Sequence, residues 1–466
     1  MDRTQRKRRV FLTGSTGTMG MEAVKVFAER LDRFELTLLA RPGKKNENKL
    51  APYLKMDGIS VIWGNLLNTA DIRRGVEQAD YVLHVGGMVS PQADYRPLDT
   101  FKVNVQSMQT IVDEVKRLPR RDEVAVVYIG SVAQYGPCNP PEHWGRSGDP
   151  MRPAKMDAYA RSKVAAERIL SDSGLRRWVS LRQTGILSRA MLMNASDPIA
   201  FHVPVRGVLE WVTAEDSGRL LANVCEADIP EEFWCRFYNI GGGPQYRMTN
   251  YEFESRLMRA LRCPSPEKVF DVRWFATDNF HGMWYEDSDL LENYTHFRSG
   301  IPADEYFKRL AASMPWYYSL APLAPAWLIK AGMRWVAGRN HLAPLYWKKH
   351  GCNARIDAHF GGLDKWNALP GWDGTDLSRP SDTPIHRTHG YDESKPLSAI
   401  SLDDLQEAAA HHGGKCLAQN MEQGDMLTPV SWQDADGTEF SASPASVLLG
   451  GHWGAPLTIE CVKEML

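Results

Sequence analysis

A glycine-rich segment near the start of the sequence constrains the fold more than any other feature. It spans residues 13–20 (TGSTGTMG), directly after an apolar run and directly before a helical pattern. Gly14 permits a tight turn, Gly17 lets the backbone approach a pyrophosphate, and Gly20 lets the helix pack closely on the strand. The start of such a helix offers free N–H groups and a positive dipole end to phosphates. The segment therefore predicts a dinucleotide-binding loop between a first strand and a first helix.

Short β-rich runs alternate with helical patterns from Arg9 to about Gln245. Strands buried on both faces read as nearly continuous apolar runs, and they need helices on both sides. The rhythm predicts an α/β fold, a Rossmann-type doubly wound parallel sheet. The expected strands are 10–13, 35–40, 60–63, 81–85, 125–130 and 178–183, and the expected helices include 20–31, 99–118 and 158–173.

The alternation of strand and helix patterns ends after Gly243. A helix is expected at 251–261, a region rich in Trp and Tyr follows, and a Pro-, Asp- and Ser-rich connector at 370–384 indicates a domain boundary. Another helix is expected at 402–411. We predict a dinucleotide-binding Rossmann domain at 1–245, a smaller α-rich lobe at 246–375 expected to bind substrate, and a C-terminal module at 385–466.

The charge balance and apolar runs exclude several classes of protein. With 55 basic and 57 acidic residues the net charge is −2, whereas dedicated nucleic-acid binders carry a basic excess. No signal peptide is evident, no run reaches the ~20 apolar residues of a membrane span, and the seven cysteines are scattered. Residues 315–335 raise the alternative of lying on a membrane surface, but their prolines are expected to break a continuous amphipathic helix. We expect a cytoplasmic protein with a small-molecule substrate, no nucleic acid and no stable membrane insertion.

The end of the second strand bears on the choice of nucleotide. An NAD-specific site usually places an acidic residue there to bind the ribose hydroxyls. Here the strand ends in Arg41, with Lys44 and Lys45 close behind. A guanidinium suits a 2′-phosphate. NADP(H) is therefore favoured and NAD(H) remains an alternative; the other interpretation is that these are only exposed loop charges.

Tyr159 and Lys163 stand four residues apart, on one face of an expected helix. A free tyrosine has a pKa of about 10, and a nearby cation favours the phenolate. Ser131 follows an expected strand, where loops form ligand sites. These three side chains predict general acid–base chemistry at a carbonyl or alcohol, with Ser131 holding the reacting oxygen.

Together these motifs resemble the extended branch of the short-chain dehydrogenase/reductase family, which includes the NAD-dependent epimerases and dehydratases. The similarity runs from Val10 to Gly243, about half of the chain. Its carriers are residues 13–20, 81–87, 104–105, 131–136, 159 with 163, and 238–243.

The resemblance implies a role for each matching residue. Tyr159 is expected to be the general acid/base, Lys163 its ribose-binding partner, Ser131 the group that orients the substrate oxygen, and Asn104 a support for the active-site water network. Asn65 stands where the family commonly has an acid, and its carbonyl oxygen can still accept from the adenine amino group. The expected cofactor-binding residues are Gly14, Ser15, Thr16, Gly17, Thr18, Met19, Gly20, Arg41, Lys44, Asn65, Leu66, Val85, Gly86, Gly87, Tyr159, Lys163, Gln183, Thr184, Gly185 and Ile186. The resemblance also implies a homodimer that packs through helices 99–118 and 158–173.

The region after Gly243 is expected to supply the substrate site. Aromatic walls suit a hydrophobic ring or acyl group better than a diphosphate sugar, although the rings can equally build the core of this lobe. We expect an NADP(H)-dependent reductase or dehydrogenase; the alternatives are a nucleotide-sugar epimerase or dehydratase with tightly bound NAD, and a non-catalytic cofactor-sensing scaffold. The aromatic residues are Trp274, Phe275, Phe280, Trp284, Tyr285, Trp316, Tyr317, Tyr318, Trp327, Trp335, Tyr346 and Trp347.

The last 80 or so residues resemble a zinc-ribbon or treble-clef module that has lost its ligands. The expected ligand positions hold Asp434, Thr438 and Gly454, which leaves Cys416 and a displaced Cys461. Structural zinc needs four ligands. We therefore expect no metal, and a module that packs on the enzyme or joins subunits.

Overall fold

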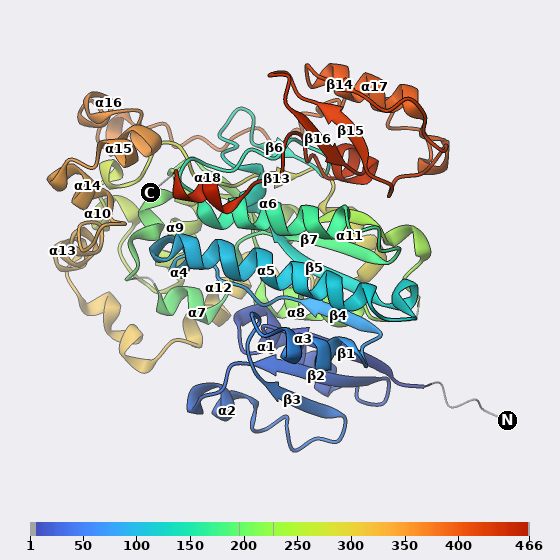
Figure 1. Cartoon of the computed structure of the whole chain (residues 1–466). Helices are drawn as coiled ribbons and strands as arrows, with labels where there is room; N and C mark the ends of the chain where they lie inside the picture. The colour runs from blue at the N-terminus through green and yellow to red at the C-terminus, as the bar shows by residue number, and fades with distance from the viewer. Residues whose placement is uncertain (1–5, 195, 227, 465–466) are drawn as a thin grey trace.

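A seven-stranded parallel sheet forms the centre of the molecule in the computed structural model, which describes residues 6–194, 196–226 and 228–464 (Figure 1). Every neighbouring pair in this sheet is parallel. The Rossmann-type prediction is therefore confirmed. In sheet order the strands are β11 (Arg236–Ile240), β7 (Trp178–Gln183), β5 (Ala125–Ser131), β4 (Tyr81–His84), β1 (Arg8–Thr13), β2 (Phe34–Ala40) and β3 (Ile59–Trp63).

Successive side chains along each strand point to opposite faces, and each face has its own apolar core. In β1, Val10 and Leu12 enter one core and Phe11 enters the other. Helices α1 (Thr18–Ala28), α8 (Ala214–Asn223) and α11 (Ser288–Thr295) cover the first face. Helices α3 (Thr69–Val76), α5 (Pro97–Lys116) and α6 (Ala158–Ser171) cover the second, and α5 and α6 lie side by side (Figure 1).

Residues 244–375 form a mostly helical lobe beside the carboxyl ends of the strands. The predicted helix at 251–261 is α9 (Asn250–Ala260), which begins with a capping box between Thr249 and Glu252. The other helices of the lobe are α10 (Pro266–Val269), α12 (Ala303–Ala312), α13 (Ala326–Val336), α14 (Pro344–His350), α15 (Asn353–Phe360) and α16 (Leu363–Asn367). A short helix, α2 (Lys44–Leu50), connects β2 to β3. The remaining short elements are α4 (Gln92–Tyr95), α7 (Arg189–Met193), β6 (Trp144–Gly145), β8 (Ile186–Leu187), β9 (Val208–Glu210), β10 (Val212–Thr213), β12 (Arg247–Thr249) and β13 (Trp284–Tyr285).

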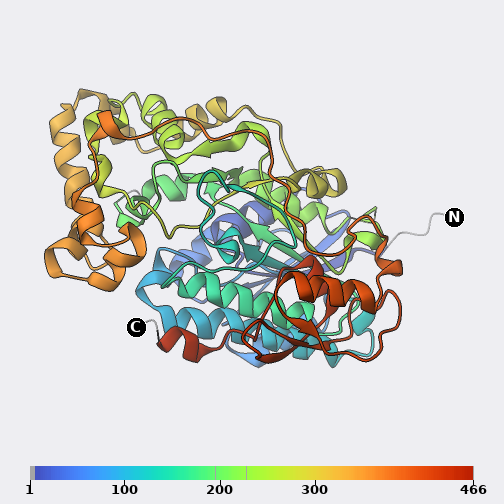
Figure 2. The same ribbon diagram turned by 90° about the horizontal axis from the view of Figure 1, so that it is seen from above.

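The C-terminal residues fold against the outside of the sheet (Figures 1 and 2). They comprise α17 (Leu402–His411), an antiparallel sheet of β14 (Lys415–Cys416), β15 (Val430–Gln433) and β16 (Glu439–Ala442), and α18 (Ile459–Lys463). Trp432, Phe440 and Leu448 belong to the same apolar core as strand residues Trp178 and Phe237. The expected packing on the enzyme is therefore observed, whereas the zinc-ribbon resemblance stays a prediction.

Asp434 and His452 of this module both have protein partners. The Asp434 carboxylate accepts hydrogen bonds from the backbone N–H groups of Asp436 and Thr438 at 3.0 and 2.9 Å. His452 Nε2 lies 2.8 Å from Glu167 of α6. Within the described residues, no group of three or more His, Cys, Asp or Glu side chains is arranged to hold a metal ion.

The prolines of the 315–335 segment do not prevent a helix. Pro315 and Pro325 stand at the N-caps of a 3-10 helix (Trp316–Leu323) and of α13. Proline suits the start of a helix, where no partner exists for its missing N–H. They do divide the segment, because the 3-10 helix ends at Leu323 and α13 begins only at Ala326, so the expected break of a continuous helix is confirmed. Across the described parts of the chain, no helix has the length and apolar character needed to cross a membrane.

Candidate active site

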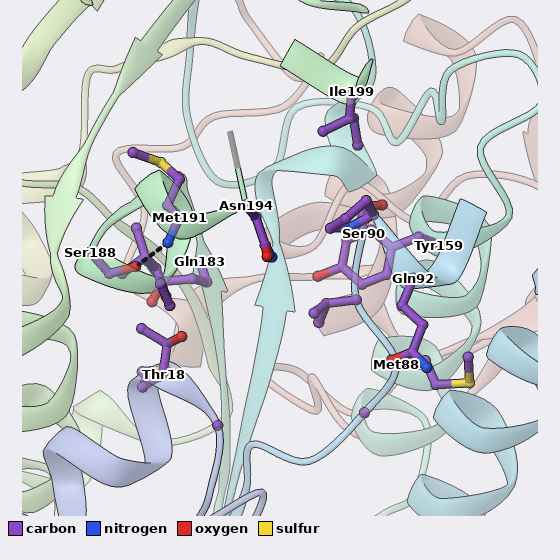
Figure 3. Close-up of a pocket in the computed structure, with 18 of the residues that line it drawn as sticks. Thr18, Met88, Ser90, Gln92, Tyr159, Gln183, Ser188, Met191, Asn194 and Ile199 are labelled. Atoms are coloured by element: carbon purple, nitrogen blue, oxygen red, sulfur yellow. Dashed lines mark hydrogen bonds between the residues drawn. The ribbon is translucent and has the colours of Figure 1, made fainter. Parts of the chain in front are cut away.

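One large cavity, with a volume of about 1350 Å³, opens where β1, β4, β5 and β7 end. Figure 3 shows Thr18 at the start of α1 and, across the cavity, Gln183, Ser188 and Met191 facing Ser90 and Tyr159. All the predicted site residues line this cavity except Ser15 and Asn104. Ser15 is buried, and its hydroxyl donates to the backbone oxygen of Leu39 at 3.2 Å.

The glycine loop closes tightly against the loop that follows β4. Gly14 has a φ of +72°, and a Cβ there would lie 2.6 Å from the backbone nitrogen of Gly86. A Cβ at Gly20 would lie 2.2 Å from the carbonyl oxygen of Gly14. Only glycine fits either place, because both clashes are with backbone atoms. The first turn of α1 is thereby held open toward the cavity, as a pyrophosphate site requires.

A positively charged corner lies beside the glycine loop. Arg41, Lys44, Lys45 and Lys49 line the cavity there, and Lys49 Nζ donates to the carbonyl oxygen of Thr16 at 2.8 Å. None of these four cations forms a salt bridge with a described carboxylate. Lys49 was not predicted, although it stands one helical turn after Lys45 on α2. This corner fits a phosphate group better than an uncharged ribose edge.

Asn65, which is expected to contact adenine, lines the cavity, and both its backbone and its side chain form hydrogen bonds. Its Oδ1 accepts from the backbone nitrogen of Leu67 at 3.0 Å, and its own N–H donates to Asp71. A carbonyl oxygen has two lone pairs, so one acceptor position remains for an adenine amino group. The adenine contact of Asn65 expected from the sequence therefore stays a prediction.

Tyr159, Ser131 and Lys163 come together at the wall of the cavity. Lys163 Nζ lies 5.9 Å from the centre of the Tyr159 ring and donates to the backbone oxygen of Ile129 at 2.7 Å. Burial raises the pKa of Tyr159 to about 12, although its hydrogen bond with Ser131 acts in the opposite direction. Burial lowers the pKa of Lys163 to about 8. Burial therefore keeps the Tyr159 phenol protonated at neutral pH in this state, and the effect of Lys163 on the phenolate stays a prediction.

Asn104 is buried behind the cavity wall and does not line the cavity itself. Its Oδ1 accepts from the Met88 N–H at 2.8 Å, and its Nδ2 donates to the Met88 carbonyl and to the Ser162 hydroxyl. Ser162 in turn donates to the carbonyl oxygen of Tyr159 at 2.7 Å. Asn104 thus connects the loop after β4 to the first turn of α6.

His84 and Ser162 support the site, and neither was identified from the sequence. The His84 ring bonds through Nδ1 to Thr13 and through Nε2 to Ser107, at 2.9 and 3.1 Å. Thr13 also accepts from the Gly86 N–H at 3.0 Å. Burial lowers the pKa of His84 to about 3, so the ring is neutral at neutral pH. Its place at the last position of β4, where ligand sites lie, was the available signal.

The strand-end residues 183–186 line the same cavity as Ser131, Tyr159 and Lys163. Gly185 packs against Trp211, since a Cβ there would lie 2.6 Å from the indole ring. The Gln183 side chain donates to the Thr184 carbonyl at 3.1 Å, while its buried Oε1 has no partner among the described residues. A buried unpaired amide oxygen fits a ligand amide donor, such as the carboxamide of nicotinamide.

The far half of the cavity is apolar, but most of the predicted aromatic residues do not line it. Only Phe275, Phe280 and Tyr318 of the twelve do so. Trp284, Tyr285 and Trp347 are fully buried, because this lobe needs large rings for its own core. The wall is built instead from methionine, leucine and other aromatic side chains: Met88, Met191, Leu192, Phe201, Leu209, Trp211, Met248, Phe253, Leu257, Met258, Leu261, Phe270 and Met333.

Glu254 is an exception on that apolar wall. Burial raises the pKa of its carboxyl group to about 7. Within the described residues no hydrogen bond or salt bridge holds it, although its neighbour Glu252 caps α9. A carboxyl group placed this way is a candidate contact for a polar group of the ligand.

Parts of the chain are similar in sequence to curated proteins. Two curated relatives match parts of the chain: UDP-N-acetylglucosamine 4,6-dehydratase (inverting) of Campylobacter jejuni is 23% identical over 108 residues (23% of this chain, 32% of that protein), and 3 beta-hydroxysteroid dehydrogenase type 7 of Rattus norvegicus is 26% identical over 185 residues (39% of this chain, 52% of that protein). The chain thus spans about a third and about half of their lengths.

Solved structures share the fold at low sequence identity. A dTDP-glucose 4,6-dehydratase from Bacillus anthracis, in complex with NAD, aligns with a TM-score of 0.52 and 14% identity over 66% of this chain and 96% of that one. A UDP-glucose 4-epimerase from Thermus thermophilus, also in complex with NAD, gives 0.50 and 18% over 65% and 98%. Residues 10–182, which carry the glycine loop, Ser131, Tyr159 and Lys163, match the model of the NAD dependent epimerase/dehydratase family.

Proposed function

We propose that this protein is an NADP(H)-dependent oxidoreductase that interconverts a carbonyl and an alcohol on a hydrophobic small molecule. One observation carries the proposal: the glycine loop, the Ser131–Tyr159–Lys163 group and an apolar chamber line a single continuous cavity. The nucleotide side holds four basic residues and the substrate side holds mostly methionine, leucine and phenylalanine. The name of one partial relative, a hydroxysteroid dehydrogenase, fits an apolar substrate of this kind.

The nucleotide would be held by residues 14–20, by Arg41 and Lys44 at its 2′-phosphate, and by Lys163 and Gln183 near the nicotinamide. Lys163 uses one N–H on the Ile129 carbonyl, which leaves two donors for ribose hydroxyls. Nicotinamide supplies the hydride when bound. Binding of the substrate oxygen and transfer of the proton are carried out by protein side chains.

Ser131 and Tyr159 act on the substrate oxygen. Both hydroxyls donate hydrogen bonds to the carbonyl, and Tyr159 transfers its proton as negative charge develops on that oxygen. A phenol whose pKa is about 12 remains protonated at neutral pH, which suits the donor required for reduction. Lys163, with a pKa of about 8, is mainly an ammonium at pH 7 and stabilises the phenolate that remains.

A panel of apolar aldehydes and ketones, incubated with NADPH or NADH and followed by nucleotide absorbance, tests this proposal. We expect oxidation of NADPH with a preference over NADH. Protein that carries tightly bound NAD when purified, and that consumes no added nucleotide, would point to the epimerase or dehydratase alternative. Binding of NADPH without turnover of any panel member or nucleotide sugar would favour the cofactor-sensing scaffold.

A further inference from the structure

A band of large apolar side chains faces solvent between Trp316 and Trp335. Their exposed fractions run from 48% at Leu320 to 79% at Leu323. Single exposed apolar residues are ordinary, but a contiguous set marks contact with another molecule or phase. We call this set the outer face; its members are Trp316, Tyr317, Leu320, Leu323, Trp327, Leu328 and Trp335.

Helix α13 is apolar on both sides. Ile329, Met333 and Val336 pack inward against the core that contains Phe270 and Phe275. Trp327, Leu328 and Trp335 point outward, and α13 lies at the left edge of Figure 1, away from the sheet. Besides its buried side, α13 thus carries a second apolar face, and a contiguous exposed face of this kind marks contact with another molecule or phase. The outer side of α13 therefore needs a partner that the chain itself does not provide within its described residues.

The charges around the outer face indicate what kind of partner it is. Residues 306–356 include no aspartate or glutamate. The acids just before them, Asp304 and Glu305, pair with Arg256 and Arg309. Tryptophan and tyrosine among apolar residues, flanked by lysine and arginine, are the composition that binds at an anionic bilayer interface. The basic residues are Lys308, Arg309, Lys330, Arg334, Arg339, Lys348, Lys349 and Arg355.

A second copy of the chain fits this surface less well. A symmetric dimer places the same patch of both copies in contact. Lys330 and Arg334 would then approach their own counterparts, and Asp271, whose carboxylate lies within range of Lys330, is already paired with Arg273. Like charges brought together in this way oppose association.

The same segment also forms part of the cavity wall. Tyr318 lies between outer-face residues, and Met333 lies on the inner side of α13; both line the cavity. Val89, which is 52% exposed, lines it as well. An apolar route therefore leads from the outer face to the chamber beside Tyr159.

We propose that residues 316–336 dock on the surface of an anionic lipid bilayer, and that a lipid-soluble substrate enters the cavity from this bilayer past Tyr318 and Met333. The docking stands independently, whereas the entry of substrate rests on the proposed function. The contact is peripheral, with the outer face lying in the interface and the basic residues at the headgroups.

Flotation of the full-length protein with vesicles tests the docking. We expect binding to phosphatidylcholine vesicles that contain phosphatidylserine, and weak binding to phosphatidylcholine alone. Replacing both Lys330→Gln and Arg334→Gln should weaken binding about fivefold for each charge removed. The combination Trp327→Ser, Leu328→Ser and Trp335→Ser should abolish it, whereas Leu290→Ser, at an exposed leucine elsewhere, should leave it unchanged.

Three results would overturn the docking: no flotation of the wild type, flotation that both outer-face variants retain, or dimers in light scattering that the triple serine variant loses while no vesicles bind. NADPH binding, measured by nucleotide fluorescence on every variant, confirms that each one is folded.

Turnover separates the two proposals. A carbonyl substrate embedded in anionic vesicles should be reduced by the wild type and at least tenfold more slowly by the triple serine variant. The same substrate dispersed in detergent should be reduced equally by both. Equal rates in vesicles would overturn entry from the bilayer. Flotation without turnover of any substrate would refute the proposed function and the entry route while the docking stands.

Discussion

His452 Nε2 lies 2.8 Å from Glu167 Oε1, and both side chains are buried between α6 and the C-terminal module. Burial opposes ionisation of Glu167, but Arg182 and His452 together hold its pKa well below the usual range. An ionised carboxylate only accepts, so His452 donates from Nε2. Arg182 also donates to the Gly450 carbonyl at 2.7 Å. Glu167 stands one turn after Lys163, so the C-terminal module braces the helix that carries Tyr159 and Lys163.

Glu167→Gln should destabilise the protein strongly. The change leaves the Arg182 guanidinium buried without its counter-charge, which costs ~3–5 kcal/mol. Urea denaturation followed by circular dichroism measures this loss, and Glu460→Gln, at an exposed carboxylate, is the control. A loss below about 1 kcal/mol would contradict the bracing role.

A chain ending at residue 384 should not form a cooperative fold. Its sheet would lose the apolar cover that Trp432, Phe440 and Leu448 provide over Trp178 and Phe237. We expect aggregation, or a form without a sharp thermal transition in calorimetry. A soluble fragment that melts cooperatively and binds NADPH would show the module to be dispensable.

Tyr159→Phe should reduce turnover about 10²–10⁴-fold, the usual contribution of a positioned general acid. The ring and its packing remain, so the dissociation constant for NADPH should stay within about twofold of wild type. Steady-state kinetics and nucleotide fluorescence measure the two quantities. Tyr346→Phe, at a tyrosine outside the cavity lining, is the matched control. Retention of more than half of the wild-type rate would remove Tyr159 from the mechanism.

Arg41→Glu should weaken NADPH binding about tenfold and leave NADH binding almost unchanged. The guanidinium is exposed, so its charge-assisted contact with a 2′-phosphate is partly screened and weakens further in high salt. Titration of both nucleotides at two salt concentrations measures this preference, with Lys55→Glu as the control. Equal losses for NADPH and NADH would refute the assignment of Arg41 to the 2′-phosphate.

Glu254→Gln should stabilise the protein at pH 8 but not at pH 5. Burial raises the folded-state pKa of this carboxyl to about 7, above the value of 4.5 of an exposed glutamate. The folded state therefore retains a proton that the unfolded state releases, and stability falls as the pH rises through this window. Two and a half pKa units would correspond to ~3 kcal/mol, and partial contact with solvent in the cavity reduces the expected gain to about 1–2 kcal/mol. Thermal melts across the pH range measure it, with Glu35→Gln as the control. A gain that is independent of pH would contradict this explanation.

Helix α18 lies on the two helices that are expected to form the homodimer interface. Ile459 and Val462 in and around α18 pack with Phe101 of α5 and Ala165 of α6, the two helices expected to form the interface. Any dimer built on those helices would include α18. Light scattering of the wild type and of Val462→Asp, which should weaken such a dimer, checks the prediction.

Local patterns predicted the sheet well because its strands carry their own signal. Six of the seven strands were identified, and the helix at 402–411 matches α17 in both bounds. The edge strand β11 was missed as an element because Arg236 and Asn239 interrupt its apolar pattern. Its Asn239 is buried and bonds to Tyr135 and Asp287, a tertiary arrangement that no local pattern reveals.

The site divides in the same way. Residues within single loops, such as Gly14 and Gly20, were predictable because their backbone geometry demands glycine. The apolar chamber was not, because Met191, Leu257 and Met333 come from α7, α9 and α13 and meet only in the folded lobe. The high pKa of Tyr159 was missed for a similar reason: spacing along a helix reveals the neighbouring cation, but not the burial that raises the pKa of the phenol.

The apolar cover over Trp178 and Phe237 also sets the order of events during synthesis. These strand residues leave the ribosome well before Trp432 and Leu448, and at about 5–20 residues per second the interval is roughly 15–50 s. Throughout it, one side of the nascent sheet exposes residues that will later be buried. A holdase that covers this nascent surface should therefore raise the yield of native protein, because exposed apolar strands favour aggregation.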